Sequence, residues 1–152
     1  MTKRHSRTEV PYSAIEMFDL VADVERYPEF IPYCIGLRVI NDNAKDGEGD
    51  LTADMLVAYK MFREKFRSHV TLNRSDGVID VEYVDGPFKY LKNKWRFESR
   101  EDGGSVINFD IDFEFKNIIL QTAAKNVFER AFLKMSEAFV ERAEIIYGKE
   151  NQ

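Results

Sequence analysis

Ser68 and His69 are neighbouring residues with the side chains of a nucleophile and a base. A histidine beside a serine can remove the hydroxyl proton and activate the oxygen for acyl transfer. The segment around this pair alternates apolar and polar residues as a strand does, and neighbours in a strand point to opposite faces. Ser68 and His69 therefore cannot act on each other, and we expect His69 on the outward face of a sheet.

The remaining reactive groups show no spacing typical of a catalytic or metal site. Neither the two histidines, His5 and His69, nor the single Cys34 has metal-ligand spacing, and one cysteine excludes an internal disulfide. Cys34 is expected to be a small buried side chain. The Gly103-Gly104 pair lacks the strand-to-helix context of a phosphate-binding loop. The sequence therefore predicts no catalytic residue, no metal and no enzyme activity.

Composition narrows the classes of function. The 152 residues, 44% of them hydrophobic, suffice for one domain over residues 1–152. Twelve Phe and seven Tyr can form an ordinary core or the wall of a cavity for a flat apolar ligand, and composition does not decide between them. A net charge of −5 argues against a DNA partner. No apolar run approaches the roughly 18 residues of a membrane span, and no signal peptide is evident, so we expect a cytoplasmic protein.

Helix signals stand near both ends of the chain. After a strand over residues 3–10, Ser13 and Glu16 form a capping-box pattern for a helix that ends at Ala22. A second short helix is expected over residues 24–30. Asn117 is the expected N-cap of a long helix to Tyr147, in which apolar residues recur every three or four positions.

Between these helices, from residue 35 to residue 115, the apolar residues recur with the period of two that is typical of strands. The outward positions of the last two strands are charged, with Lys92, Lys94 and Arg96 expected beside the acidic row Asp110, Asp112 and Glu114. A sheet with one apolar face and a long amphipathic helix must bury those faces against each other. The predicted fold class is α+β: a curved antiparallel sheet of about seven strands wrapped around a long C-terminal helix, with two short helices after the first strand.

Successive turns of such a sheet lie at alternate ends. The turns at one end, residues 41–50, 75–77 and 101–104, are polar. The segments at the other end, residues 30–33, 59–62, 86–91 and 116–120, carry apolar groups, and we call them the mouth segments. They either fold over the core or form a hydrophobic mouth with a cationic rim for an anionic membrane surface. The predicted rim residues are Lys60, Met61, Phe62, Lys89, Ile118 and Ile119.

Three stretches carry a resemblance to a known family: residues 21–34 with their two prolines, residues 86–97 and residues 109–115. Together with the closing helix they give a resemblance, running over nearly the whole chain, to the coenzyme Q-binding branch of the START-like (polyketide cyclase/dehydrase-like) superfamily. The resemblance implies a helix-grip fold and a pocket for ubiquinone or a similar isoprenoid lipid, with no covalent or metal cofactor. The family also includes bacterial ribosome-association toxins. Where the family has Pro-Trp-Cys, this chain has Pro32-Tyr33-Cys34.

The inward positions of the predicted strands and of the long helix define a hydrophobic groove that could bury an isoprenoid tail. For any single ring ordinary core packing remains the alternative, and the prediction concerns the set. The predicted ligand-binding residues are Tyr33, Val57, Tyr59, Phe66, Phe88, Trp95, Phe97, Phe109, Phe113, Val127, Phe128 and Phe132.

Three functions stay open at this stage. The first is a non-enzymatic carrier that delivers ubiquinone to respiratory complexes from the surface of a bacterial inner membrane. The second is an inhibitor that binds the large ribosomal subunit through Lys3, Arg4, Arg7 and the rim. The third is a polyketide aromatase/cyclase, which requires polar groups inside the cavity, where the sequence places only Ser68, Asn93 and Tyr83.

Overall fold

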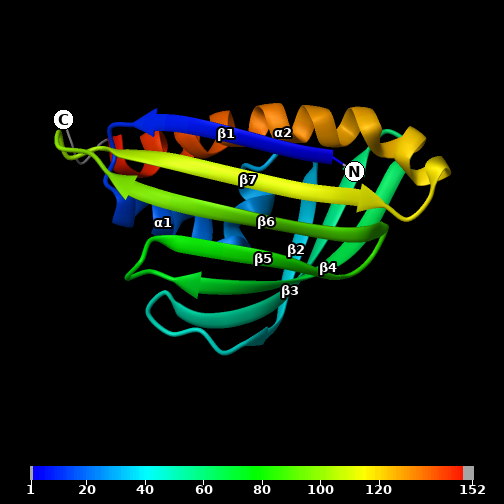
Figure 1. Cartoon of the computed structure of the whole chain (residues 1–152), viewed down its shortest axis with the longest axis horizontal. Helices are drawn as coiled ribbons and strands as arrows, with labels where there is room; N and C mark the ends of the chain where they lie inside the picture. Colours follow the sequence, from blue (N-terminus) through cyan, green and yellow to red (C-terminus); the bar gives the residue numbers. More distant parts are fainter. Residues whose placement is uncertain (1, 149–152) are drawn as a thin grey trace.

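Seven antiparallel strands form one curved sheet in the computed structural model, which describes residues 2–148 (Figure 1). The strands follow one another across the sheet in the order β1-β7-β6-β5-β4-β3-β2, so that the first strand joins the last and every other pair is a hairpin. The predicted α+β helix-grip architecture is confirmed. The strands are β1 (Thr2–Val10), β2 (Cys34–Asp42), β3 (Glu48–Tyr59), β4 (Phe62–Asn73), β5 (Val78–Asp85), β6 (Phe88–Ser99) and β7 (Ser105–Phe115).

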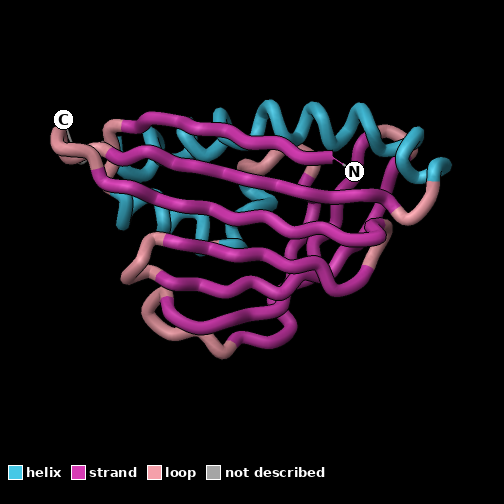
Figure 2. Tube along the Cα trace, viewed as in Figure 1, coloured by secondary structure: helices cyan, strands magenta, loops and turns pink. Residues whose placement is uncertain are grey.

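Three helical segments cover one face of this sheet (Figure 2). They are α1 (Ala14–Ala22), the 3₁₀ helix η1 (Val24–Glu29) and the long α2 (Ile118–Tyr147). Helix α2 runs along β1 and β7 and contacts α1, while α1 packs on β5, β6 and β7 (Figure 1). The other face of the sheet points away from the helices, and on β6 and β7 most of its residues are charged, as the alternation predicted.

The helix boundaries follow from local hydrogen bonds. The Ser13 hydroxyl accepts a bond from the Glu16 backbone N–H, and the Glu16 carboxylate accepts one from the Ser13 N–H, which is the predicted capping box. The Asn117 side chain accepts a bond from the Leu120 N–H at the start of α2. These caps satisfy backbone donors that the first turn of a helix leaves unpaired.

Two predicted boundaries differ from the structure. The hairpin loop expected over residues 41–50 is shorter, because β2 continues to Asp42 and β3 begins at Glu48. The side chains here are polar, but the backbones of β2 and β3 still pair with neighbouring strands. A loop length predicted from polar composition alone is therefore too long. The second short helix ends at Glu29 as a 3₁₀ helix with Pro28 inside it. A proline removes a donor and favours such a tight turn over a longer α-helix.

The outward charges of β6 and β7 pair across the strands as predicted. Lys94 lies opposite Asp110 and Lys92 opposite Asp112 in the register. Arg96 lies 3.7 Å from Asp110, and the Lys94 ammonium lies 3.7 Å from Asp80 on β5. This basic stripe is therefore largely neutralised by acidic neighbours.

The buried core has two parts. The larger lies between α1, the second half of α2 and the centre of the sheet, where Phe139 of α2 contacts Trp95 of β6 at 5.3 Å between ring centroids. The smaller surrounds Phe88, whose ring contacts Phe113 at 5.9 Å and Phe128 at 5.2 Å. It lies toward the N-terminal end of α2, so the two parts follow the length of the helix.

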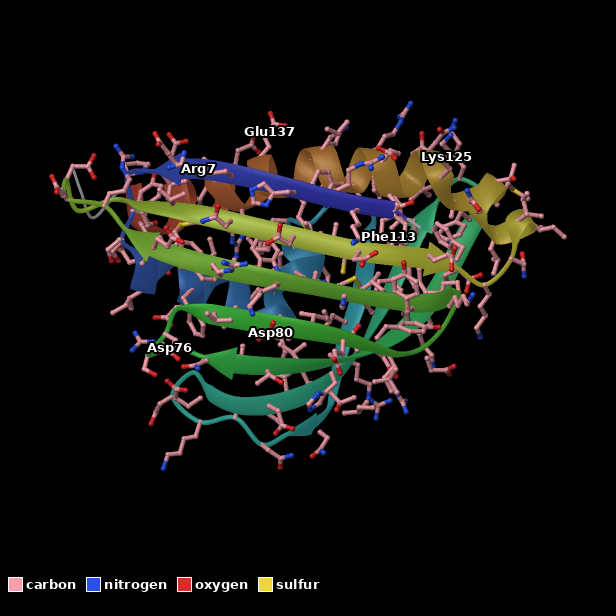
Figure 3. All side chains as sticks on the ribbon, in the orientation of Figure 1. Arg7, Asp76, Asp80, Phe113, Lys125 and Glu137 are labelled. Atoms are coloured by element: carbon pink, nitrogen blue, oxygen red, sulfur yellow. The ribbon has the colours of Figure 1, made fainter. Side chains whose placement is uncertain are left out.

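The mouth segments meet at one end of the molecule. The Tyr33 ring contacts Tyr59 at 4.9 Å, the Lys116 N–H donates to the Pro87 carbonyl at 3.0 Å, and Phe62 lies against Phe128 of α2. The polar turns lie at the opposite end: in Figure 3, Asp76 of the turn between β4 and β5 is far from Phe113 and Lys125, which lie toward the N-terminal end of α2. The predicted sorting of connections into two ends is thus borne out.

Candidate ligand-binding cavity

A cavity of about 190 Å³ lies between α2 and the inward face of the sheet. Side chains of β2 to β7, of α1, η1 and the segment after it, and of α2 form its wall. Most of the wall is aliphatic or aromatic. An apolar cavity of about 150 Å³ accommodates benzene, so this space has room for one ring.

Most of the residues predicted to bind a ligand line this cavity. Phe66 of β4, Trp95 of β6 and the β7 residues Phe109 and Phe113 supply the sheet side, and α2 supplies the opposite side. The predicted residues in the wall are Tyr33, Val57, Phe66, Trp95, Phe109, Phe113, Val127, Phe128 and Phe132.

The other three predicted residues lie outside the wall. Tyr59 is at the end of β3, where its hydroxyl accepts a hydrogen bond from Arg130 of α2 at 3.0 Å. Phe88 is 1% exposed and forms the centre of the smaller core. Phe97 packs edge-to-face on Phe18 of α1 at 5.7 Å. All three hold elements together around the cavity.

Sequence reasoning missed the contribution of the short helices. One side of the cavity is closed by Val21 of α1, by Val24 and Tyr27 of η1, and by Ile31 just after η1. Their apolar character was visible, but nothing in a period of three or four residues shows which part of a sheet a short helix will cover. Four further strand residues line the cavity, at inward positions that the alternation of apolar and polar residues predicts: Met55, Ile79, Leu91 and Ile111.

Few polar groups reach the wall, and two of them already have partners. The Tyr27 hydroxyl donates to the Val21 carbonyl at 2.5 Å, and its burial raises the pKa of the phenol. The Cys34 thiol donates to the Gly36 carbonyl at 3.6 Å, and burial raises the pKa of this thiol to about 11. Both groups are therefore neutral at physiological pH.

The wall also contains Tyr33, Ser68 and Asn93. The Asn93 Oδ1 atom is buried and has no hydrogen-bond partner among residues 2–148. Tyr83, expected inside the cavity from the sequence, is not part of the wall, and its hydroxyl accepts a bond from the Phe88 N–H at 3.2 Å.

The segment before β2 has an unusual backbone. Tyr33 has a φ of 68°, in the left-handed region that a residue with a Cβ seldom adopts. Its carbonyl accepts a bond from the Ala58 N–H of β3 at 3.0 Å, and its ring rests on Tyr59. These contacts hold the Tyr33 ring in the wall of the cavity, at the end where the mouth segments lie.

The mouth segments expose apolar side chains that the fold leaves without a partner. Met61 is 97% exposed, and Ile118 and Ile119 are 76% and 77% exposed. Phe62, which the sequence predicted to belong to the rim, turns inward against Phe128. The exposed apolar rim is therefore narrower than predicted, with Met61 at its tip.

The cations of the rim surround these apolar residues. Lys60 and Lys89 are exposed, and the Lys89 ammonium lies 3.6 Å from Glu114. The left-handed φ of 54° at Lys60 allows the tight turn between β3 and β4. This combination of apolar tip and flanking ammonium groups suits the interface of an anionic bilayer.

The arrangement offers binding contacts and little that resembles catalytic machinery. Ser68 lines the cavity, while His69 lies on the outward side, where its Nε2 is 2.7 Å from Asp50 Oδ2. The predicted separation of these two side chains is confirmed. Within residues 2–148 no group of three or more potential ligands could hold a metal ion, and no helix there is long and apolar enough to cross a membrane.

Comparisons with solved structures agree with the fold. The 18 kDa protein CC1736 from Caulobacter crescentus is 32% identical, with a TM-score of 0.78 over 97% of this chain and 99% of that one. The Zhui aromatase/cyclase from Streptomyces sp. R1128 has a TM-score of 0.77 over 94% of both chains at 17% identity, a likeness of fold alone.

Comparisons of sequence identify the family. The ribosome association toxin RatA of Escherichia coli K12 is 38% identical over 141 residues, which are 91% of this chain and 85% of RatA. The mitochondrial coenzyme Q-binding protein COQ10 of Drosophila melanogaster is 31% identical over 136 residues, 87% of this chain and 54% of COQ10. A family model described as polyketide cyclase/dehydrase and lipid transport matches residues 10–140. The chain therefore belongs to this START-like family, as its sequence motifs predicted.

Proposed function

We propose that the protein is a non-enzymatic carrier that binds a quinone, ubiquinone being the first candidate, and delivers it in support of respiratory electron transport. The observation that carries this proposal is the apolar cavity between α2 and the sheet, walled by Trp95, Phe109 and Phe132. Burial of an apolar ligand contributes about 0.8 kcal/mol per methylene group. The coenzyme Q-binding name of the Drosophila relative supports a quinone as the cargo.

Delivery of such a ligand requires contact with a bilayer, because a quinone with an isoprenoid tail resides there. We place this contact at the mouth, where Met61, Ile118 and Ile119 are exposed among lysines. In this proposal the protein works in the bacterial cytoplasm, peripherally on the inner membrane. The receiving partner would be a respiratory complex.

The test is to extract the purified protein with organic solvent and identify bound lipid by mass spectrometry. A variant with Phe109 and Phe128 changed to serine serves as the comparison, with its folding checked by circular dichroism. The proposal expects a stoichiometric quinone in the wild type and none in a folded variant. A wild-type protein that carries no quinone and takes none up from vesicles would refute the carrier function.

Ribosome association is the second candidate, favoured by the names of the relatives at 30 to 38% identity. The net charge of −5 and the ion-paired stripe of β6 weigh against an extensive RNA contact. Cosedimentation with ribosomal subunits at two salt concentrations tests it: a specific inhibitor should accompany the large subunit at moderate salt. Absence from that fraction would remove this candidate.

A polyketide aromatase/cyclase is the third candidate, and its support is weaker. Few polar side chains line the cavity, and the hydroxyl of Tyr27 and the thiol of Cys34 are already hydrogen-bonded to backbone carbonyls. Cyclisation of a polyketide requires groups that move protons and hold enolate oxygens.

A further inference from the structure

Asn93 is a polar residue at an apolar position. It stands on β6 at an inward position between Leu91 and Trp95, and its partners across the neighbouring strands are Val81 and Ile111. The side chains of Leu91, Val81 and Ile111 have no hydrogen to donate to the Asn93 Oδ1 atom, and the Trp95 indole N–H does not bond to it. Its Oδ1 is buried and has no partner among residues 2–148, although Asn93 lines the cavity.

Such a group destabilises the folded protein, because it leaves water without gaining a hydrogen bond. Buried polar side chains in native proteins nearly always have partners, so an exception calls for a cause. A leucine has the same number of side-chain heavy atoms and the same branching as asparagine, and it would match the apolar character of the surrounding wall. The unpaired Oδ1 atom therefore points to a hydrogen-bond donor that arrives with a ligand.

The surroundings of Asn93 define where such a ligand would lie. On one side of Asn93, Trp95 and Phe109 lie 4.2 Å apart between ring centroids, and Phe132 of α2 approaches Phe109 at 5.9 Å. On the other side, toward the mouth, the wall continues through Phe113 and Phe128, which lie 5.9 Å apart. The cavity of about 190 Å³ is larger than the cavity of about 150 Å³ that binds benzene, so it accommodates a small ring system without a long tail.

We propose that the Asn93 carboxamide is the specificity-determining group of the cavity and binds an oxygen substituent on the ring of the ligand. The ring lies against Trp95 and Phe109, and any tail leaves past Phe113 and Phe128 toward the mouth. The unpaired Oδ1 accepts a hydrogen bond from a ring hydroxyl, such as that of a reduced quinone, and the N–H groups of the same carboxamide are donors of the kind that a quinone carbonyl requires. This inference deepens the proposed carrier function and rests on it only for the identity of the natural ligand.

The experiment compares two ring ligands that differ by one hydroxyl group, 2-naphthol and naphthalene. Their affinities are measured by calorimetry for the wild type, for Asn93→Leu and for Asn108→Leu. Asn108 is the matched control, because it is a carboxamide on the outward side of β7. Asn93→Val is a smaller replacement that serves if leucine disturbs packing.

The inference expects Asn93→Leu to lower the ratio of naphthol affinity to naphthalene affinity by about tenfold or more, since a buried hydrogen bond is lost. Asn108→Leu should leave the ratio unchanged. The empty Asn93→Leu protein should also unfold at a higher temperature than the wild type, because an unpaired polar group has been replaced by a packed apolar one. An equal ratio in the wild type and in both Asn93 variants would overturn the inference.

A short-tailed ubiquinone separates this inference from the proposed function. Trp95 is the single tryptophan of the chain, so a quinone ring beside it should quench the protein fluorescence. Quenching with the same affinity in the wild type and Asn93→Leu would retain the carrier function and overturn the role of Asn93. Naphthol discrimination without any binding of the quinone would retain the role of Asn93 and refute the quinone cargo.

Discussion

Replacing Met61, Ile118 and Ile119 by serine should detach the protein from anionic membranes while leaving its fold intact. These side chains are 97%, 76% and 77% exposed, so they contribute little to the core. Each would contribute about 2 kcal/mol if it moved fully from water into the bilayer, or roughly 6 kcal/mol for the three. Half of that transfer, about 3 kcal/mol, corresponds to an affinity change of about 100-fold.

The measurement is cosedimentation with vesicles that contain a phosphatidylglycerol fraction, over a titration of lipid. The matched control replaces three other exposed apolar residues, Ile15, Leu133 and Ile145, which are 52%, 71% and 62% exposed and lie outside the mouth segments. The triple mouth variant should lose binding, and the control variant should keep it. Equal binding of both variants would refute the placement of the membrane contact at the mouth.

Three further outcomes follow from the packing and the ionisation of single residues. Phe139 is 1% exposed, so Phe139→Ala should lower the free energy of unfolding by about 3 to 5 kcal/mol in urea titrations, and a loss near zero would contradict the packing. The Arg67 guanidinium donates to Asp54 at 2.8 Å and lowers the pKa of that carboxyl. The stability that this ion pair adds is present above the ordinary pKa of an aspartate and is lost as pH falls through the lowered pKa of Asp54. The difference in unfolding free energy between the wild type and Asp54→Asn should therefore shrink below about pH 4. An equal difference at pH 6 and pH 3 would contradict the role of the ion pair. With its pKa raised to about 11, Cys34 should react slowly with iodoacetamide at pH 8 and much faster in urea, whereas fast native labelling would contradict its burial.

The strands and helices could be predicted because their signals are local. The alternation of β7 and the cap at Asn117 each depend on residues adjacent in sequence, and both match the structure. The inward position of Phe88 breaks the alternation of β6, because the register shifts between Phe88 and Tyr90 and turns Lys89 outward. A bulge of this kind depends on the partner strand, so a pattern within one strand cannot show it.

The composition of the cavity wall was harder to predict than the sheet. An inward residue lines a cavity only if no other side chain fills the space beside it, and this depends on distant elements. Phe97 is inward but is covered by Phe18 of α1, whereas Trp95, two positions away, reaches the cavity. Asn93 was identified as inward from the alternation, but its lack of a hydrogen-bond partner required the positions of Val81 and Ile111.

The size of the cavity connects the two parts of the proposed site. Pockets that enclose a whole drug-sized ligand measure about 300 to 1,000 Å³, and the space here is about 190 Å³. A quinone ring fits beside Trp95, but a long isoprenoid tail does not fit with it. The tail must then extend past Phe113 and Phe128 to the exposed residues of the mouth, where a bilayer would cover it. A carrier of this kind needs the cavity and the mouth together, whereas ribosome association through the rim needs no cavity, so variants at Asn93 should affect only a lipid function.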